Sequence, residues 1–278
     1  MRSEDFELLS GLLKQRSGLV LPKDKAYLLE NRLTPLARQN GFRGLEELVA
    51  AIRTSRPEEI LAQVTEAMTT NESMFFRDRR PFEQVRKVLL PGLMPAREPL
   101  RRIRIWSAGC SSGQEPYSLC MLLREAGEAL SDWHFDITAT DLSTTMLTKA
   151  RAGIYTQFEV QRGLPIKMLI RHFHQIDEQW QIAEAIRSMV KFRLFNLLDP
   201  PDELGDFDVV FCRNVLIYFD QATKARVLNA IADRMAEDGV LFLGSAETVL
   251  GVTDRFSPVQ GQRGMYHLQG KTPAIAKP

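Results

Sequence analysis

The sequence has few cysteines and none of the pairs that bind a structural metal. Its three cysteines, Cys110, Cys120 and Cys212, are widely spaced, and neither a C-x-x-C pair nor a His/Cys cluster occurs. An odd, scattered set of thiols is typical of a protein kept reduced inside the cell, which excludes a disulfide-built secreted scaffold. The four histidines form no metal-ligand motif, so we expect no metal site.

Long apolar runs and a large net charge are also missing. No stretch approaches the roughly 20 apolar residues that span a bilayer, and the first 14 residues lack the apolar core of a signal peptide. Lys and Arg number 36 against 35 Asp and Glu among 278 residues, which argues against a globally basic nucleic-acid binder. We therefore expect a cytoplasmic protein that neither inserts into membranes nor binds nucleic acid.

The composition that is present, 44% hydrophobic and 26% charged, is that of an ordinary globular protein. Apolar residues recur at helical spacing through about the first 85 residues, and no strand pattern interrupts them. In the second helical stretch, Pro35 is expected to kink or split the helix. Ser55–Glu58 has the form of a capping box before a fourth helix that ends near Met68. We predict a helical N-terminal domain over 1–85 and a proline-containing linker over 86–100.

Strand and helix patterns alternate from residue 101 onward. Strand candidates lie at 103–106, 135–140, 190–194, 207–212 and 240–243, with helices between them. This alternation predicts an α/β domain over 101–270, built on a doubly wound, mostly parallel sheet. Residues 152–189 break the pattern with a short helix and a hairpin at Asp177-Glu178, so we predict a small β-subdomain inserted there. The polar tail 271–278 is predicted to be mobile.

The loop after the first predicted strand has the residues of a ligand site. Gly109 and Gly113 form a G-x-x-x-G pattern, which is neither the dinucleotide fingerprint nor a P-loop. Asp141 ends the second strand, where a carboxylate can accept hydrogen bonds from both ribose hydroxyls, although it could instead cap the following helix. A nucleoside cofactor without a pyrophosphate fits this loop better than NAD, and S-adenosylmethionine is the leading candidate.

Three motifs resemble a known family, in the same order and spacing. They are Thr70–Asp78 (TNESMFFRD), Ala108–Ser118 (AGCSSGQEPYS) and Phe211–Phe219 (FCRNVLIYF). Over about residues 1–268 the sequence closely resembles the chemotaxis receptor methyltransferases, the CheR family. The resemblance implies a class I, Rossmann-like methyltransferase domain behind an all-α domain. It also implies an S-adenosylmethionine-dependent protein-glutamate O-methyltransferase, with S-adenosylhomocysteine as the product, acting on the cytoplasmic helices of methyl-accepting chemoreceptors.

The resemblance also assigns cofactor contacts to individual residues. Carried onto this sequence, they fall on Asn71, Ser73, Arg77, Glu115, Asp141, Asn196, Leu197, Arg213 and Asn214. Many relatives have Thr where this chain has Ser73, and both residues supply a hydroxyl. Other interpretations stand beside these: Glu115 could favour a helix N-terminus, Asn196 could be a turn residue, and Phe75 and Phe76 could pack between the domains.

The reaction that the resemblance implies needs positioning more than proton transfer. A glutamate side chain has a pKa near 4.3, so it is already ionised at neutral pH and needs no general base. In-line alignment and removal of water are the remaining requirements. We predict that Arg77 aims the carboxylate, with Tyr218 as a neutral hydrogen-bond partner or wall. Arg77 could instead bind the carboxylate of the cofactor.

A basic region in the helical domain suits an acidic partner. Residues 14–43 contain seven Lys or Arg against two Asp or Glu, which is either a solvated helix face or a docking surface. With the resemblance, we expect Glu-rich receptor helices to dock on the region Lys14–Arg43. The β-subdomain lacks the Gly-rich loop of relatives that bind a C-terminal receptor peptide, so we expect this chain not to use that tether.

Two other functions compete with this hypothesis. One is a methyltransferase that acts on a different protein or a small molecule; the second is a non-catalytic sensor of S-adenosyl compounds. The segment Arg213–Tyr218 loosely resembles the Asn-x-x-Tyr motif of amine methylators, but Val215 and Leu216 replace the proline pair expected there. The intact Asn71, Arg77, Asp141 and Tyr218 argue against a site that has lost its activity.

Overall fold

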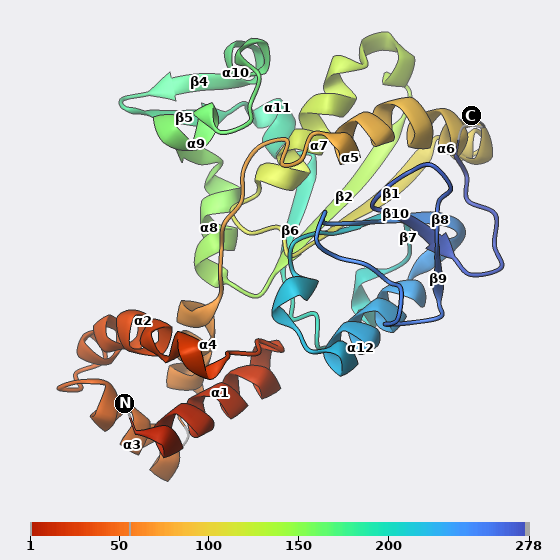
Figure 1. The fold of residues 1–278 in the computed structure, drawn as a ribbon. Helices are drawn as coiled ribbons and strands as arrows, with labels where there is room; N and C mark the ends of the chain where they lie inside the picture. The colour runs from red at the N-terminus through yellow and green to blue at the C-terminus, as the bar shows by residue number, and fades with distance from the viewer. Residues whose placement is uncertain (1, 56, 276–278) are drawn as a thin grey trace. The chain divides into compact units, whose positions relative to one another are not determined.

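The computed structural model describes residues 2–55 and 57–275, and these form two compact units (Figure 1). The first unit contains the chain up to Thr70 together with Tyr218–Thr223, and the second contains Asn71–Ile217 and the chain from Lys224. The boundary therefore lies at residue 70 and not at residue 85 as predicted. The helical pattern of 80–97 belongs to the second unit, because its apolar residues are buried in that unit's core.

The first unit is a small helical bundle. Its elements in the described chain are α1 (Ser3–Ser17), a 3₁₀ turn (Lys23–Lys25), α2 (Ala26–Gln39), α3 (Leu45–Ser55) and α4 (Glu58–Met68). Leu9 and Leu13 of α1 and Leu29 and Leu33 of α2 are fully buried in its leucine-rich core. Short helices are marginal alone, so this shared apolar core is what stabilises them.

Two local predictions in this unit differ from the structure. Pro35 lies inside α2 and does not split it, because Leu33 and Ala37 on either side are buried and offset the roughly 3 kcal/mol cost of an internal proline. The alternative that Pro35 kinks the helix stays a prediction. Ser55 does not cap the fourth helix. It is the last residue of α3, and its hydroxyl donates to the Ala51 carbonyl at 3.2 Å.

The second unit is built on a seven-stranded sheet of order β6-β2-β1-β7-β8-β10-β9. The five strands from β6 to β8 are parallel, and β10 and β9 are added antiparallel. The predicted mostly parallel sheet is therefore confirmed. The strands are β1 (Arg102–Ala108), β2 (His134–Asp141), β6 (Val190–Leu194), β7 (Phe207–Cys212), β8 (Met235–Leu243), β9 (Phe256–Pro258) and β10 (Met265–Leu268).

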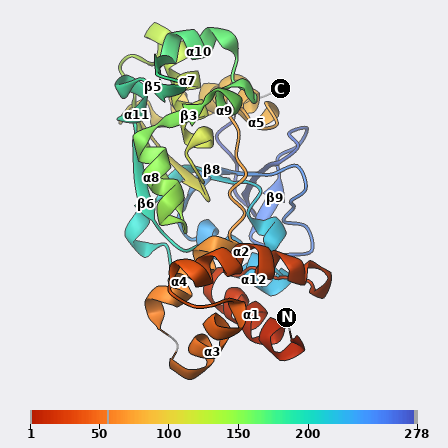
Figure 2. The same ribbon diagram turned by 90° about the vertical axis from the view of Figure 1, so that its left-hand side faces the viewer.

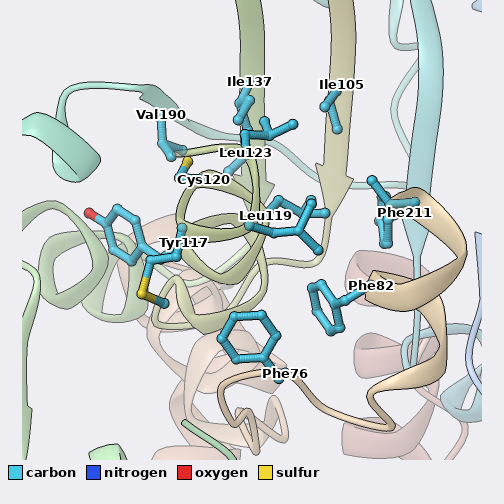
Figure 3. Packing of buried hydrophobic residues seen from close by; sticks show 14 of the residues in the cluster. Phe76, Phe82, Ile105, Tyr117, Leu119, Cys120, Leu123, Ile137, Val190 and Phe211 are labelled. Carbon is cyan, nitrogen blue, oxygen red and sulfur yellow. The ribbon is translucent and has the colours of Figure 1, made fainter. Parts of the chain in front are cut away.

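Helices pack against this sheet through an apolar core. Leu119 and Leu123 of α7 point toward Ile105, Ile137 and other strand residues (Figure 3). Phe211 and Phe242 stack on neighbouring parallel strands with ring centroids 4.4 Å apart. The helices are α5 (Arg80–Gln84), a π-helical turn (Val85–Leu89), α6 (Leu90–Arg97), α7 (Gln114–Glu125), a 3₁₀ turn (Gly127–Leu130), α8 (Thr144–Ala152) and α12 (Gln221–Ala232).

The segment 86–100, predicted as a linker, is mostly helical. Pro91 stands in the first turn of α6, which continues directly from the π-helical turn Val85–Leu89. Leu89, Leu90 and Leu93 are buried in the core of the second unit. The prolines that suggested a linker therefore start and punctuate a helix, and burial of these leucines keeps the segment ordered.

The inserted β-subdomain is present as predicted (Figure 2). It has an antiparallel three-stranded sheet of order β3-β5-β4, with the hairpin turn at Asp177 (φ 51°) and Glu178. The Phe75 ring packs edge-on against the Tyr155 ring of the subdomain, with ring centroids 5.0 Å apart. Phe75 therefore lies in the core of the second unit, and not between the domains as the sequence suggested. The elements are β3 (Ile154–Thr156), α9 (Gln157–Gln161), α10 (Ile166–His172), β4 (Phe173–Ile176), β5 (Gln179–Ile182) and α11 (Glu184–Arg187).

The part of the tail that the structure describes packs against the rest of the second unit. The Ala274 N–H donates to the Asp238 carbonyl at 2.9 Å, and Lys271 pairs with Glu237 at 2.7 Å. Ile275 lies directly over Gly92, where a Cβ atom would come within 2.3 Å of its backbone. The predicted mobility of 271–278 stays a prediction, and the last three of these residues lie outside the described chain.

Candidate active site

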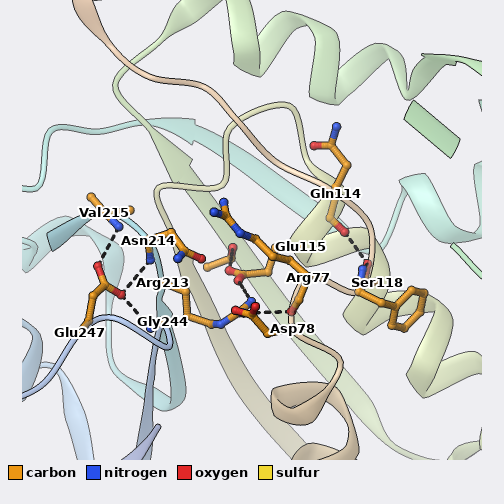
Figure 4. Close-up of polar contacts among 12 residues, drawn as sticks. Arg77, Asp78, Gln114, Glu115, Ser118, Arg213, Asn214, Val215, Gly244 and Glu247 are labelled. Carbon is orange, nitrogen blue, oxygen red and sulfur yellow. Dashed lines mark hydrogen bonds and ion pairs between the residues drawn. The ribbon is translucent and has the colours of Figure 1, made fainter. Parts of the chain in front are cut away.

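The sheet changes its winding direction at β1. The chain passes from β1 to β2 on one side, and the later strand β7 pairs with β1 on the other side. Ligands of doubly wound sheets bind beyond the carboxyl ends of the strands at such a switch point. Three segments of the predicted site lie at this edge: the loop after β1, Asp141 at the end of β2, and Arg213 with Asn214 after β7. Figure 4 shows Arg213 and Asn214 with their polar partners.

The loop after β1 needs glycine at two places. Gly109 has φ 75° and Gly113 has φ 93°, both in the left-handed region. A Cβ atom on Gly109 would lie 2.4 Å from Cγ2 of Val215, and one on Gly113 would lie 3.0 Å from the Tyr117 ring. The two glycines therefore let this loop approach its neighbours more closely than any other residue would allow.

Asp141 supports that loop and does not cap the next helix. Its Oδ2 accepts a hydrogen bond from the Ser111 N–H at 2.7 Å, and its Oδ1 accepts one from the Ser143 N–H at 2.9 Å. The cap of α8 is Ser143, whose hydroxyl accepts from the Met146 N–H at 3.1 Å. The carboxylate of Asp141 is therefore fixed at the ends of β1 and β2, and its predicted contact with a ribose stays a prediction.

Arg213 joins three segments from inside the protein. Its side chain is 1% exposed, and its guanidinium pairs with Glu115 at 2.8 Å and Asp78 at 2.7 Å. It also donates to the Arg77 carbonyl at 2.9 Å and lies 5.9 Å from the centre of the Phe82 ring. The two terminal nitrogens are thus bound by protein groups, so the side chain acts as a clamp, while its Nε is buried without a hydrogen-bond partner in the described chain. The cofactor contact that the resemblance gives Arg213 stays a prediction.

Glu115 does more than stabilise a helix N-terminus. It stands in the first turn of α7, where a negative charge is favourable. Its Oε2 pairs with Arg213, and its Oε1 accepts a hydrogen bond from the Ser107 hydroxyl of β1 at 2.8 Å. The side chain therefore ties the end of β1 to the motif that follows β7.

The N-terminal motif enters the second unit along the same loop. The Ser111 hydroxyl donates to the Asn71 carbonyl at 3.1 Å, and the Phe76 N–H donates to the Ser118 hydroxyl at 2.9 Å. Ser73 is half-buried in the same stretch. The Ser111 hydroxyl of the loop and the Ser118 hydroxyl of α7 thus hold this segment in place over the start of α7.

Arg77 lies in a strained turn and is partly exposed. Phe76, Asp78 and Arg79 have φ values of 49°, 67° and 45°, which non-glycine residues rarely adopt. The Arg77 guanidinium donates to the Glu72 carbonyl at 3.0 Å. One face of this guanidinium is therefore bound within its own motif.

Asn196 and Leu197 follow the edge strand β6. The Asn196 Oδ1 accepts from the Leu198 N–H at 3.1 Å, and its carbonyl accepts from the Asp199 N–H at 2.9 Å. This is an Asx turn, so the alternative role of Asn196 as a turn residue has direct geometric support. Both residues are half-buried, and their contact with a cofactor stays a prediction.

Glu247 is a site residue that the sequence motifs did not indicate. Its carboxylate accepts hydrogen bonds from the backbone N–H groups of Asn214, Val215 and Gly244 at 2.7 to 2.9 Å. It follows the carboxyl end of β8, a parallel strand next to β7. Attention to polar residues after every parallel strand would have found it.

Tyr218 belongs to the other unit. Its carbonyl accepts a hydrogen bond from the Val20 N–H at 2.9 Å, and Asp220 nearby in the chain pairs with Lys14 at 2.7 Å. The structure thus groups Tyr218 with the helical unit, whereas Arg77 belongs to the second unit. The prediction that the two residues act together stays a prediction.

The cysteines are packing residues in this structure. Cys110, Cys120 and Cys212 are buried and unpaired, and burial raises the pKa of each thiol above its ordinary value. Neutral buried thiols are poor nucleophiles. Within residues 2–55 and 57–275 no group of three or more His, Cys, Asp or Glu side chains could hold a metal ion. No helix of the described chain is long and apolar enough to cross a membrane.

Comparison with known proteins places both units in one family. The family description "CheR methyltransferase, all-alpha domain" matches residues 4–69, and "CheR methyltransferase, SAM binding domain" matches residues 71–265. The boundary between the two matches coincides with the boundary between the two compact units. Each structural unit therefore corresponds to one domain of that family.

Curated relatives cover nearly the whole chain. It is 44% identical over 269 residues to "Chemotaxis protein methyltransferase 1" of Pseudomonas aeruginosa and 41% identical over 267 residues to "Chemotaxis protein methyltransferase Cher2" of Pseudomonas putida. Each alignment covers 95% of this chain and 97% of the relative. A protein of Vibrio anguillarum named "Chemotaxis protein methyltransferase" is 38% identical, with 95% and 96% covered. The chain belongs to the CheR methyltransferase family, with an all-α domain followed by an S-adenosylmethionine-binding methyltransferase domain.

Proposed function

We propose that this protein transfers a methyl group from S-adenosylmethionine to the side-chain carboxylate of specific glutamates on chemoreceptor cytoplasmic helices. The products are a glutamate methyl ester and S-adenosylhomocysteine, and the protein acts in the cytoplasm. The observation that carries the proposal is the meeting of three family motifs at the switch point of the sheet, joined by the buried Arg213. The names of the relatives support a role in chemotaxis.

The residues at the switch point fit S-adenosylmethionine chemically. Gly109 lets Val215 pack closely against the backbone of the loop, and Asp141 is a fixed carboxylate of the kind that accepts ribose hydroxyls. Glu115 and Asp78 add negative charge that favours a sulfonium cation nearby. When bound, the cofactor supplies the electrophilic methyl group. We propose Asn71, Ser73, Arg77, Asn196, Leu197, Arg213 and Asn214 as the remaining cofactor contacts.

The proposed reaction uses the protein to orient groups rather than to move protons. The substrate glutamate is already ionised near neutral pH, and the buried thiols are held neutral. Arg77 has one guanidinium nitrogen bound to the Glu72 carbonyl, which favours a single contact to the incoming carboxylate. A looser contact of this kind leaves the attacking oxygen more nucleophilic than a bidentate clamp would. Tyr218 is proposed as the neutral wall or hydrogen-bond partner.

The contacts within the helical unit refine the proposed docking region. Four of its seven basic side chains already have acidic partners, and Arg32 donates to the carbonyls of Met68 and Thr69 at 2.9 and 2.8 Å. Lys25 and Arg38 are exposed, and neither has an acidic partner within 4 Å in the described chain. We propose these two as the charges most available to an acidic receptor helix. The four pairs are Lys14 with Asp220, Arg16 with Glu58, Lys23 with Glu7, and Arg43 with Glu47.

The test is transfer of a radiolabelled methyl group from S-adenosylmethionine to membranes that contain chemoreceptors. We expect label on the receptor band that mild base releases as methanol, and none on membranes without receptors. Base-stable label would indicate a different methyl acceptor. Binding of the cofactor without any transfer would favour a non-catalytic sensor.

The docking charges are tested in the same assay. Replacing Lys25→Glu and Arg38→Glu together should lower receptor methylation, because both changes oppose an acidic helix. The affinity for S-adenosylmethionine should not change. The matched control is Arg86→Glu with Lys87→Glu, two exposed positions of the second unit. Equal methylation by both double variants at low salt would remove the docking proposal.

A further inference from the structure

We propose that Glu247 is a positioning residue of the cofactor site, which acts by fixing the backbone turn after β7. The proposal rests on the proposed S-adenosylmethionine site. Its basis is the juxtaposition of one carboxylate with a row of backbone N–H groups at the carboxyl end of the sheet (Figure 4). Glu247 itself makes these contacts to the backbone, so it acts on the site through the turn.

The two oxygens of Glu247 divide the backbone donors between them. Oε2 accepts from the N–H groups of Gly244 at 2.7 Å and Asn214 at 2.8 Å. Oε1 accepts from Val215 at 2.9 Å and, more weakly, from Ile217 at 3.3 Å. Hydrogen bonds to an ionised carboxylate are stronger than neutral ones. One side chain therefore holds both the turn after β7 and the end of β8.

The turn needs such an anion because of its backbone conformation. Asn214 has φ 60°, in the left-handed region that non-glycine residues rarely occupy. Successive N–H groups in a turn of this kind point to one side and form a concave anion site. In this protein the anion is supplied by the chain itself. Without it, several inward-pointing donors would lose their acceptor and the turn could relax.

The turn after β7 also holds the loop after β1, which belongs to the proposed cofactor site. Val215 lies against Gly109, where a Cβ atom would come within 2.4 Å of its Cγ2. Asn214 directly follows Arg213, the buried clamp that pairs with Glu115. A change at Glu247 is therefore transmitted by one backbone turn to both Gly109 and Arg213, without any direct contact between Glu247 and those residues being needed.

The test measures the affinity and the stoichiometry of S-adenosylmethionine binding by calorimetry on the full chain. Glu247→Gln keeps the size of the side chain but replaces one acceptor oxygen with a donor group. We expect the dissociation constant to rise about tenfold, with the stoichiometry unchanged at one. Glu247→Asp keeps the charge, so it should raise the dissociation constant less than Glu247→Gln does. Glu237→Gln, an exposed glutamate of β8 paired with Lys271, is the matched control and should bind like the wild type.

A second variant approaches the same contact from the other side. Gly244→Ala keeps Glu247, but the new Cβ atom would lie 2.7 Å from its Oε2 and 2.9 Å from the Asn214 Nδ2. Gly244→Ala should therefore also raise the dissociation constant for S-adenosylmethionine. It keeps the proposal testable if Glu247→Gln folds poorly. Wild-type affinity in both variants would overturn the proposal. A lower stoichiometry at unchanged affinity would also overturn it, because that result indicates unfolding only. This experiment measures cofactor binding and not receptor methylation. Its result therefore does not depend on whether the protein methylates receptors.

Discussion

At the scale of single residues, the site depends on a buried cation with two carboxylate partners. Removing an arginine from water is costly unless charges and hydrogen bonds replace the solvent. Arg213 has both, from Asp78, Glu115 and the Arg77 carbonyl. These partners come from two parts of the sequence, residues 77–78 and residue 115, both far from Arg213 along the chain. The folded geometry of the site is therefore coupled to the pairing of this one side chain.

Replacing Arg213→Lys should lower the affinity for S-adenosylmethionine by about tenfold or more. A lysine keeps the charge, but its single ammonium group cannot reproduce the fork that reaches Asp78 and Glu115 together. Calorimetric titration of the variant checks this. Arg102→Lys, at the exposed start of β1, is the control and should bind as the wild type does. Wild-type affinity in the Arg213 variant would show that the clamp does not shape the site.

At the scale of elements, the end of α1 is fitted to the segment that carries Tyr218. Gly18 ends α1 with φ 76°, and its N–H donates to the Lys14 carbonyl at 3.0 Å. A Cβ atom there would lie 2.9 Å from the Phe219 ring. Gly41, after α2, has a similar φ of 82° but nothing within 4 Å of the same position. A side chain at Gly41 would meet backbone strain alone, whereas one at Gly18 would meet the same strain and also crowding against Phe219.

Gly41→Ala should lower the free energy of unfolding by about 1 kcal/mol, the cost of a left-handed alanine. Gly18→Ala should lower it by about 2 to 3 kcal/mol, because the crowding against Phe219 adds to that strain. Urea unfolding of both variants, followed through the first transition, provides the comparison. Equal losses in the two variants would mean that the 218–223 segment does not press on α1.

The elements that could be predicted from the sequence are those whose structure is determined by local pattern. Elements determined by packing between distant residues could not be predicted. The parallel strands and the helices of the first unit follow from apolar periodicity. The strands β9 and β10 were missed because they are short, and Pro258 ends the first. The linker prediction failed because Pro91 marks a helix start as readily as a loop. Asp141 was found from its place at the end of a predicted strand and Asn214 from a motif. Glu247 binds backbone N–H groups in the described chain, and no sequence pattern displays such contacts.

At the scale of the whole molecule, a buried carboxylate links the core sheet of the second unit to α6. Asp208 of β7 is fully buried and pairs with Arg97 at 2.9 Å and Arg104 at 3.0 Å. Burial acts to raise the pKa of Asp208, but the hydrogen bonds and charges of Arg104 and Arg97 outweigh it, so the pKa is lowered overall. Asp208 thus favours the folded state when it is ionised.

Asp208→Asn should lower the free energy of unfolding by about 2 kcal/mol at pH 7, because it leaves Arg104 without its anion and Arg97 with Asp238 alone. The folded pKa lies below the unfolded value of about 3.9, so the stabilisation is complete above that value and is lost as the pH falls through the folded pKa. The gap between wild type and variant should therefore narrow below about pH 4. Urea titrations at pH 7, 5 and 3.5 measure it, and a gap that is constant with pH would contradict this account.

The most direct measurement of the proposed activity is the mass-spectrometric position of the transferred methyl group. A receptor cytoplasmic fragment is incubated with the protein and S-adenosylmethionine, digested, and compared before and after brief treatment with alkali. The account predicts a single added methyl on glutamate side chains that alkali removes. A methyl found on lysine, arginine or another alkali-stable position, by a protein that binds the cofactor normally, would contradict it.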